Sequence, residues 1–245
     1  MKKKVFIFTV LLVFAMIPLK VFGAGYIVNK DGKKYALVIG NNNYSRFQRL
    51  AGAGKDAITI AEKLTKLDFE VTVLTNVTAA QMNNAIDAFA AQLMESSENQ
   101  GLFWFSGHGI QLSHIGYLTG IDVDTSVERL KSGVVYIGKV FEALRAAKNV
   151  FNVVILDTEF YPINNETAVS LEPALLQQLS GNICYIRSTS PGENSADISP
   201  FIGPVLKYLN TPSEMVSSFP AITEETATAS GNRQRPFFYI PDRGR

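Results

Sequence analysis

Short, almost wholly apolar runs recur along this chain and alternate with longer stretches whose apolar residues fall on one helical face. Runs of this kind predict strands that are buried on both faces, and the stretches between them predict amphipathic helices. Strand–helix alternation is typical of a mostly parallel sheet that is covered by helices on both sides. We therefore predict an α/β fold, in which ligands bind at the carboxyl ends of the strands.

Five of the apolar runs are predicted strands, and a sixth run near the C-terminus is predicted to add an edge strand: residues 34–40, 69–76, 101–107, 151–157, 182–190 and 236–241. The predicted helices cover residues 55–67, 78–96, 138–149, 172–180 and 199–210. Thr78 is the expected N-cap of the second helix, because its hydroxyl can accept a hydrogen bond from an unpaired helical N–H. No helix or strand is predicted for the polar stretch that begins at Thr223. With no internal repeat and no low-complexity linker, residues 24–245 are predicted to form a single domain.

The first 23 residues are predicted to be a secretory signal peptide that is not part of the fold. Three lysines precede an apolar run from Val5 to Ile17, and small residues follow from Gly23 to Gly25. The run is shorter than the ~20 apolar residues that span a bilayer, so an uncleaved membrane anchor is the weaker alternative. We expect an exported protein, periplasmic or extracellular, with no stable membrane span after cleavage.

Composition narrows the class of partner. Four of the lysines lie in the predicted signal peptide, so the remainder is mildly acidic, and no basic face argues for nucleic acid. The histidines are His108 and His114, and no closely spaced Cys or acid completes a metal site, so we predict neither a metal nor another cofactor. The single cysteine, Cys184, excludes an internal disulfide and is expected to be a buried small hydrophobe.

The Gly-rich stretch Gly52–Ala57, GAGKDA, partly matches two nucleotide-binding motifs but satisfies neither. A Walker loop needs Ser or Thr where Asp56 stands and Gly where Arg49 stands. A dinucleotide fingerprint needs its glycines directly after the first strand, but a long loop follows Gly40. A Gly-rich helix start is the better interpretation.

The third predicted strand runs into Ser106-Gly107-His108-Gly109. Two glycines flank the histidine, so the backbone can turn sharply and approach a ligand closely. A histidine at the carboxyl end of a parallel strand is well placed as a general base, and Gly109 offers a backbone N–H to a developing oxyanion. The alternative is a turn with an incidental histidine.

The fourth predicted strand ends in Leu156-Asp157-Thr158-Glu159. Acidic residues rarely stand at the end of a fully apolar strand for packing reasons. His108 and Glu159 each follow such a strand, and strands joined by a helical connection are often sheet neighbours. Their loops are therefore predicted to share one cleft. The offset between the two residues is close to the ~50 residues that separate histidine and cysteine in a caspase-type peptidase.

With these motifs in this order, the chain resembles the caspase-like cysteine peptidase family, nearest to its bacterial members and to metacaspases. The matching segments are YALVIGNNNY, KDAITIAEKLTKLDFEVTVLTN, FSGHGIQ, YLTGIDVD, NICYIRSTSPGENSAD, SPFIGPVLKYL and TASGNRQRP. The resemblance implies a caspase-like three-layer α/β/α sandwich with a mostly parallel sheet of about six strands. It also implies His108 as the general base, Gly109 as the oxyanion donor, and a peptide or a protein as the ligand.

The chain departs from the family at the centre of the expected site. The family pattern after the fourth strand is Leu-Asp-x-Cys, and Glu159 stands here at the position of the nucleophilic cysteine. A carboxylate attacks a peptide carbonyl poorly, and its charge repels the oxyanion that must form. We expect Glu159 to form an ion pair with His108 that raises the pKa of the imidazole. The sequence thus predicts a catalytically inactive pseudopeptidase that binds a peptide or a protein.

By the same resemblance, three residues are assigned to substrate binding: Asp157, as the acid that shapes a pocket for basic side chains, Ser188 and Asp197. Two alternatives stay open. One is an active caspase-like endopeptidase with displaced chemistry, through Cys184 or another group. The other is a structural or interaction domain whose groove is closed, filled by the bulky side chains of residues 160–162. The sequence gives no prediction of the oligomeric state.

Overall fold

The computed structural model describes residues 32–124, 126–163, 179, 181–189 and 199–241. At its centre is a six-stranded sheet in the order β10-β9-β7-β3-β1-β2. The strands are β1 (Lys34–Gly40), β2 (Phe69–Thr75), β3 (Gln100–Ser106), β7 (Phe151–Asp157), β9 (Ile183–Arg187) and β10 (Phe237–Tyr239). All neighbours pair in parallel except β10, which runs antiparallel to β9 at one edge.

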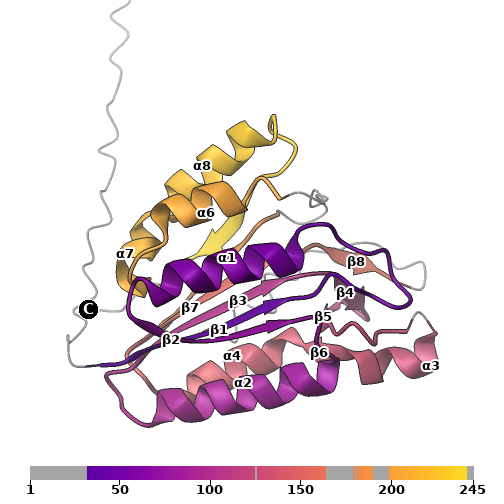
Figure 1. The fold of residues 1–245 in the computed structure, drawn as a ribbon, viewed down its shortest axis with the longest axis horizontal. Coiled ribbons are helices and arrows are strands. Elements are labelled where there is room, and N and C mark those ends of the chain that lie inside the picture. The colour runs from indigo at the N-terminus through magenta and orange to yellow at the C-terminus, as the bar shows by residue number, and fades with distance from the viewer. Residues whose placement is uncertain (1–31, 125, 164–178, 180, 190–198, 242–245) are drawn as a thin grey trace, which may run out of the picture.

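Helices cover both faces of this sheet and give the molecule three layers (Figure 1). One face carries α1 (Ala53–Thr65), α6 (Ile202–Tyr208), α7 (Pro212–Ser217) and α8 (Phe219–Ala229), and the other carries α2 (Ala79–Met94) and α4 (Ile137–Ala147). The predicted three-layer sandwich with a mostly parallel sheet of about six strands is confirmed.

The central strands are buried on both faces, which explains their unbroken apolar sequence. In β7, Val154 and Leu156 belong to the core beneath α2 and α4. Val153 and Ile155, which alternate with them, belong to the core on the α1 side of the sheet. Because alternate side chains of a strand point to opposite faces of the sheet, β7 contributes to both cores.

A small second sheet, which was not predicted, lies beyond the carboxyl ends of β3 and β7 (Figure 1). Its order is β6-β5-β4-β8, from β4 (Gly109–Leu112), β5 (Ile115–Thr119), β6 (Val134–Tyr136) and β8 (Phe160–Pro162). A short helix, α3 (Val127–Leu130), and a 3₁₀ turn, η1 (Lys131–Gly133), precede β6. Two residues separate β3 from β4, and two separate β7 from β8. The second sheet therefore holds the chain directly after the two strand ends that carry the motifs.

Helix boundaries mostly follow the sequence, but α7 and α8 near the C-terminus were not predicted. Thr78 caps α2 as predicted: its hydroxyl accepts from the Gln81 N–H at 3.2 Å, and the Gln81 side chain accepts from the Thr78 N–H at 2.9 Å. The polar stretch from Thr223, in contrast, lies inside α8, where the Thr226 hydroxyl donates to the Ile222 carbonyl at 2.7 Å. That bond satisfies a buried polar group within the helix itself. The helix predicted over residues 172–180 lies outside the described residues.

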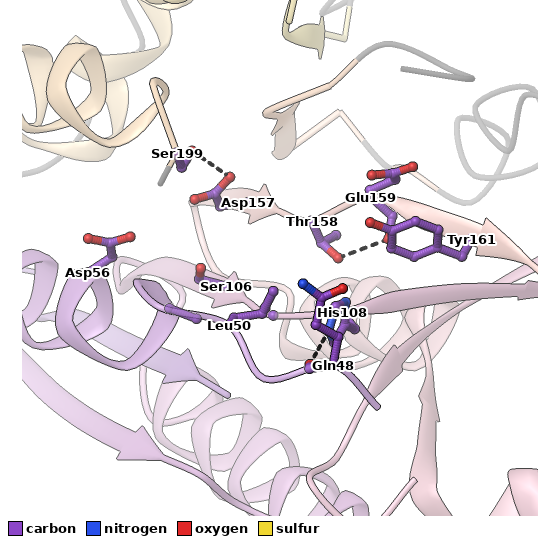
Figure 2. Close-up of a pocket in the computed structure, with 12 residues that line it drawn as sticks. Gln48, Leu50, Asp56, Ser106, His108, Asp157, Thr158, Glu159, Tyr161 and Ser199 are labelled. Atoms are coloured by element: carbon purple, nitrogen blue, oxygen red, sulfur yellow. Dashed lines mark hydrogen bonds between the residues drawn. The ribbon is translucent and has the colours of Figure 1, made fainter. Parts of the chain in front are cut away.

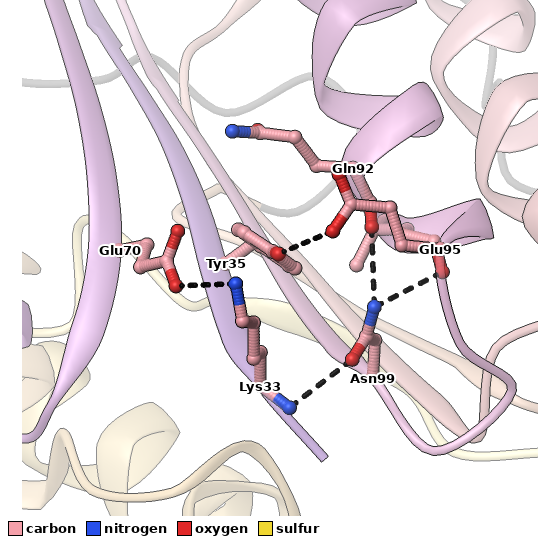
Figure 3. A network of polar contacts seen from close by, with 7 residues as sticks. Lys33, Tyr35, Glu70, Gln92, Glu95 and Asn99 are labelled. Carbon is pink, nitrogen blue, oxygen red and sulfur yellow. Dashed lines mark hydrogen bonds and ion pairs between the residues drawn. The ribbon is translucent and has the colours of Figure 1, made fainter.

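The amino end of the sheet, away from the motifs, is closed by a polar network (Figure 3). The Lys33 N–H donates to the Asn99 side chain at 3.1 Å, and the Lys33 ammonium pairs with Glu70 at 3.1 Å. The Tyr35 hydroxyl donates to Glu95 at 3.0 Å. These contacts tie the start of β1 to β2 on one side and to the turn between α2 and β3 on the other.

The hairpin between β4 and β5 turns on Ser113 and His114, whose φ angles are 51° and 61°. Two-residue hairpin turns with positive φ at both positions favour Asn-Gly, because other residues are strained there. The double change Ser113→Asn with His114→Gly is expected to raise the free energy of unfolding by about 1 kcal/mol, measured by urea denaturation. His114→Ala keeps the positive φ and should give no gain. An unchanged midpoint for the double variant would contradict this prediction.

Candidate functional site

The two motif-bearing strands end next to each other. β3 and β7 pair in register, so Ser106 and Asp157 stand side by side at the carboxyl edge of the sheet. The chain then passes through His108 on one side and Glu159 on the other before it enters the second sheet. Both residues line the same pocket, at the position where ligands bind in open α/β sheets.

This pocket has a volume of about 130 Å³ (Figure 2). Its walls come from the loop after β1, the start of α1, the ends of β3 and β7, strand β8 and the segment before α6. The lining residues are Gln48, Leu50, Ala53, Asp56, Ser106, Gly107, His108, Asp157, Thr158, Glu159, Tyr161 and Ser199. The pocket therefore brings together three residues that the sequence assigned to the site, His108, Asp157 and Glu159.

His108 is held by contacts on both its backbone and its ring. Its N–H donates to the Tyr44 hydroxyl at 2.9 Å, and its carbonyl accepts from the Thr119 hydroxyl at 2.7 Å. Its Nε2 lies 2.7 Å from the Gln48 carbonyl oxygen, and its ring lies near those of Tyr44 and Tyr161, with centroids 4.8 and 6.0 Å away. Because a carbonyl can only accept, Nε2 carries the proton in this arrangement, and Nδ1 is the nitrogen that can act as a base.

Gly109, the expected oxyanion donor, makes a bond within the protein. Its N–H donates to the Glu159 carbonyl oxygen at 3.0 Å where β4 pairs with β8. A Cβ at this position would lie 2.7 Å from the same oxygen, so only glycine allows this close approach. An oxyanion could use this N–H only if the bond between the two strands opened.

Glu159 is half-buried and lines the mouth of the pocket. Figure 2 shows its carboxylate turned away from the His108 ring and beside Tyr161. The ion pair between Glu159 and His108 that the sequence suggested stays a prediction.

Asp157 is buried and accepts a hydrogen bond from the Ser199 hydroxyl at 3.0 Å (Figure 2). Loss of solvent raises its pKa to about 6, although the nearby hydroxyls of Ser188 and Ser199 lower it, and the charge of Asp56 adds to the increase. Burial also raises the pKa of the half-buried Asp56.

The described lining of the pocket holds acidic side chains and no basic one apart from His108. Among the described residues, no Lys or Arg lines the pocket. The stretches 164–178 and 190–198, which follow β8 and precede Ser199 in the chain, contain four acids and no Lys or Arg. A buried carboxylate without a cation is costly, so the pocket is suited to a positively charged ligand.

The remaining candidates lie elsewhere. Ser188 follows the end of β9 and is fully buried, and its carbonyl accepts from the Gln234 side chain at 2.9 Å. Asp197 lies outside the described residues. Cys184 is fully buried in the core on the α1 side, as predicted, and stands opposite Val153. That point is four residues before Asp157, or about 13 Å along the strand, so the thiol is away from the pocket.

Three residues of the pocket were not predicted from the sequence: Asp56, Gln48 and Ser199. Asp56 had a signal, an acid at the start of a Gly-rich helix, but it was considered only as a failed phosphate motif. Gln48 contributes a backbone carbonyl, which any residue type can supply, so no sequence pattern could have identified it.

Two absences hold for the part of the chain that the structure describes. None of its helices is both long enough and apolar enough to cross a membrane. None of its groups of three or more His, Cys, Asp or Glu side chains is arranged to hold a metal ion.

Comparison with known proteins places residues 33–242 under a family model described as the caspase domain. Human mucosa-associated lymphoid tissue lymphoma translocation protein 1 is 26% identical over 165 residues, which are 67% of this chain and 19% of that protein. Horse caspase-1 is 33% identical over 78 residues, which are 32% of this chain and 19% of that protein. The chain thus spans about a fifth of the length of these curated relatives.

A crystal structure of protein GSU0716 from Geobacter sulfurreducens has a similar backbone, with a TM-score of 0.61 at 17% identity. The match covers 86% of this chain and 95% of that one. At this level of identity the likeness concerns the fold alone.

Proposed function

The chain belongs to the caspase-domain family, and from that premise we propose that it is a pseudopeptidase, which binds a peptide or a protein through a basic side chain without cleaving it. The observation that carries the proposal is the acidic pocket at the strand ends. Asp157 lies at its base with Asp56 near by, and Glu159 stands where the family pattern has its cysteine.

Two features argue against peptide hydrolysis at this pocket. A thiolate nucleophile is missing, because the single cysteine of the chain, Cys184, is buried in the core away from the pocket. The Gly109 N–H, which would stabilise an oxyanion, donates to the Glu159 carbonyl instead. Nucleophilic attack and charge stabilisation are the two steps that a peptidase of this type needs.

The acids of the pocket favour a cationic group of the ligand. A guanidinium or an ammonium would neutralise the buried Asp157 and could also reach Asp56. Arg suits such a site better than Lys does, because its planar fork can donate to both oxygens of a carboxylate. The proposed ligand is therefore a peptide segment that contains Arg or Lys.

The two alternatives fit the observations less well. An endopeptidase that used Cys184 would need the β9 core to open, since that thiol is fully buried. A domain with a closed groove is disfavoured because Tyr161 is 39% exposed and lines the pocket, which keeps its volume of about 130 Å³. The sequence of residues 1–23 supports export, so we place the proposed binding outside the cytoplasm.

Binding of capped peptides that contain Arg, Lys or Gln at one position tests the proposal, with affinities measured by calorimetry. We expect Arg to bind best, Lys less well and Gln not at all, with no hydrolysis on prolonged incubation. Asp157→Ala should weaken binding of the Arg peptide by about tenfold or more, because it removes the buried charge that pairs with the cation. Equal binding by this variant would contradict the proposal.

The same titration has an expected pH dependence. The ionised form of Asp157 binds the cation, and its pKa of about 6 in the empty pocket means that this form is lost as the pH falls through that value. Affinity for the Arg peptide should therefore decrease from pH 7.5 to pH 5. If the protein instead hydrolyses the peptide, and iodoacetamide or Cys184→Ser abolishes that activity, the endopeptidase alternative is correct.

A further inference from the structure

The strand β2 forms one edge of the main sheet, and its outer row of backbone groups pairs with no described residue (Figure 1). The Asn76 N–H donates to the Gly40 carbonyl at 3.0 Å, so the even-numbered residues of β2 turn their backbone groups toward β1. The N–H and C=O groups of Val71, Val73 and Thr75 consequently point away from the sheet. They form a template on which another strand can pair.

This edge has few of the features that keep sheet edges from pairing. Edge strands are commonly protected by charges, by prolines or bulges, or by being very short. β2 runs for seven residues without a proline, and its register with β1 is continuous. Its single charged side chain, Glu70, is already paired with Lys33 at 3.1 Å. The edge strand on the other side of the sheet, β10, has only three residues. The length and composition of β2 therefore indicate a strand partner.

Apolar side chains that face solvent flank the same edge. Val73 in β2 is 43% exposed, and Ile58 in α1 is 49% exposed. Val73 lies on the α1 face of the sheet, since Val71, two residues away, packs against the core on that side. Asp56 lines the pocket from one side of α1, so Ile58, about 200° further round the helix, faces the β2 side. Exposed apolar side chains beside an unpaired strand edge indicate an interaction surface.

The sequence of β2 is complementary to itself. Val71-Thr72-Val73 reads the same in both directions, so an antiparallel copy centred on Thr72 places each Val71 opposite a Val73 and the two Thr72 residues opposite each other. Val71 and Val73 both point their backbone groups outward, as they must for such a pair to exchange two hydrogen bonds. Pairs of β-branched side chains and pairs of threonines stabilise neighbouring strands. Glu70 falls opposite Leu74, so no like charges face each other.

We infer that two copies of this chain pair through β2 in antiparallel orientation, across a two-fold axis at Thr72, so that one sheet continues through both copies. The axis is perpendicular to the sheet, so both α1 helices lie on the same face and cover Ile58 and Val73. The contact uses no residue of the pocket, and the two pockets of the dimer open at opposite ends of the joined sheet. One strand pair with its flanking side chains is a small interface, below about 1,200 Å², so we expect a reversible dimer.

Sedimentation equilibrium of the full chain over a range of concentrations tests this inference, with charge changes at the exposed Thr72. We expect the wild type to form a dimer whose population rises with concentration. Thr72→Lys and Thr72→Glu should each raise the dissociation constant by about tenfold or more, because two like charges then face each other at the axis. An equimolar mixture of the two variants should dimerise again, because opposite charges then face each other.

Thr228→Lys is the matched control. It makes the same change on the exposed side of α8, which packs near β10 at the other edge of the sheet, and it should leave the dissociation constant unchanged. Circular dichroism checks that each variant is folded. A wild-type chain that stays monomeric would overturn the inference, and the edge would then be available only to a strand of another protein. A dimer that persists in Thr72→Lys, or a mixture that stays monomeric, would also overturn it.

Discussion

Replacing Asp157 with Asn is expected to raise the free energy of unfolding by roughly 2–3 kcal/mol at pH 7.5. The pKa of Asp157 rises from 3.8 to about 6 in the folded protein, and each pKa unit corresponds to about 1.4 kcal/mol. Desolvation is the main cause of the increase and Asp56 adds to it, while Ser188 and Ser199 offset part of it. Asn keeps the shape of the side chain and removes the charge that the pocket cannot neutralise.

The sign of the pH dependence follows from proton binding. The folded protein binds more protons at Asp157 than the unfolded chain does between about pH 4 and pH 6, so its stability falls as the pH rises through this range. The advantage of Asp157→Asn should therefore be small near pH 4 and reach its full size above pH 6. Urea denaturation at several pH values measures it.

A surface acid provides the control for this experiment. Asp87 is largely exposed and pairs with Lys139 at 2.9 Å, so Asp87→Asn should give no gain in stability at either pH. A gain for Asp157→Asn that does not change between pH 4.5 and pH 7.5 would show that the charge is not its cause. A loss of stability at pH 7.5 would contradict the prediction outright.

This gain in stability should accompany the loss of binding predicted for the same position. An uncompensated acid in a pocket destabilises the empty protein, and a cation that neutralises it recovers that energy as affinity. Stability that is sacrificed at one site is a common sign of function. A structural domain with a closed groove would have no reason to keep Asp157 in this state.

The sheet was predictable because its strands carry their own signal. β1 and β7 begin and end at the residues that the apolar runs indicated, since strands buried on both faces consist mostly of apolar residues. The second sheet was missed because β4, β6 and β8 have three or four residues each, too few to show an alternation. α8 was missed because threonines, which are weak helix formers, fill buried positions in it.

The site residues that could be predicted from the sequence are those at the ends of predicted strands. Asp157 is the last residue of β7, and His108 and Glu159 are each the second residue after β3 and β7. The parallel pairing of these two strands brings the three residues together. Asp56 lines the same pocket as Asp157 from a helix about 100 residues earlier in the chain, and only the folded structure shows that its charge acts on Asp157. The bond from Gly109 to the Glu159 carbonyl depends on the pairing of β4 with β8, which no sequence pattern indicated.

The bond from the Gly109 N–H to the Glu159 carbonyl also determines what we expect of Glu159→Cys. This variant places a thiol at the pocket mouth, and we expect iodoacetamide to label it readily. Its hydrolysis of fluorogenic peptides that end in Arg should nevertheless be about 10²–10³ slower than a site of this type with a free oxyanion donor would allow. The Gly109 N–H would still donate to the carbonyl of residue 159, and loss of one oxyanion donor costs about 10²–10³ in rate.

The experiment is best done in a Cys184→Ser background, so that the label reports on residue 159 alone. Fast turnover by Glu159→Cys would mean that substrate binding breaks the bond between β4 and β8 and frees the Gly109 N–H. The natural protein would then be a peptidase disarmed by one substitution. Labelling without turnover would mean that a thiol alone does not restore catalysis, because the backbone at Gly109 is also unsuited to it. The pocket would then serve binding.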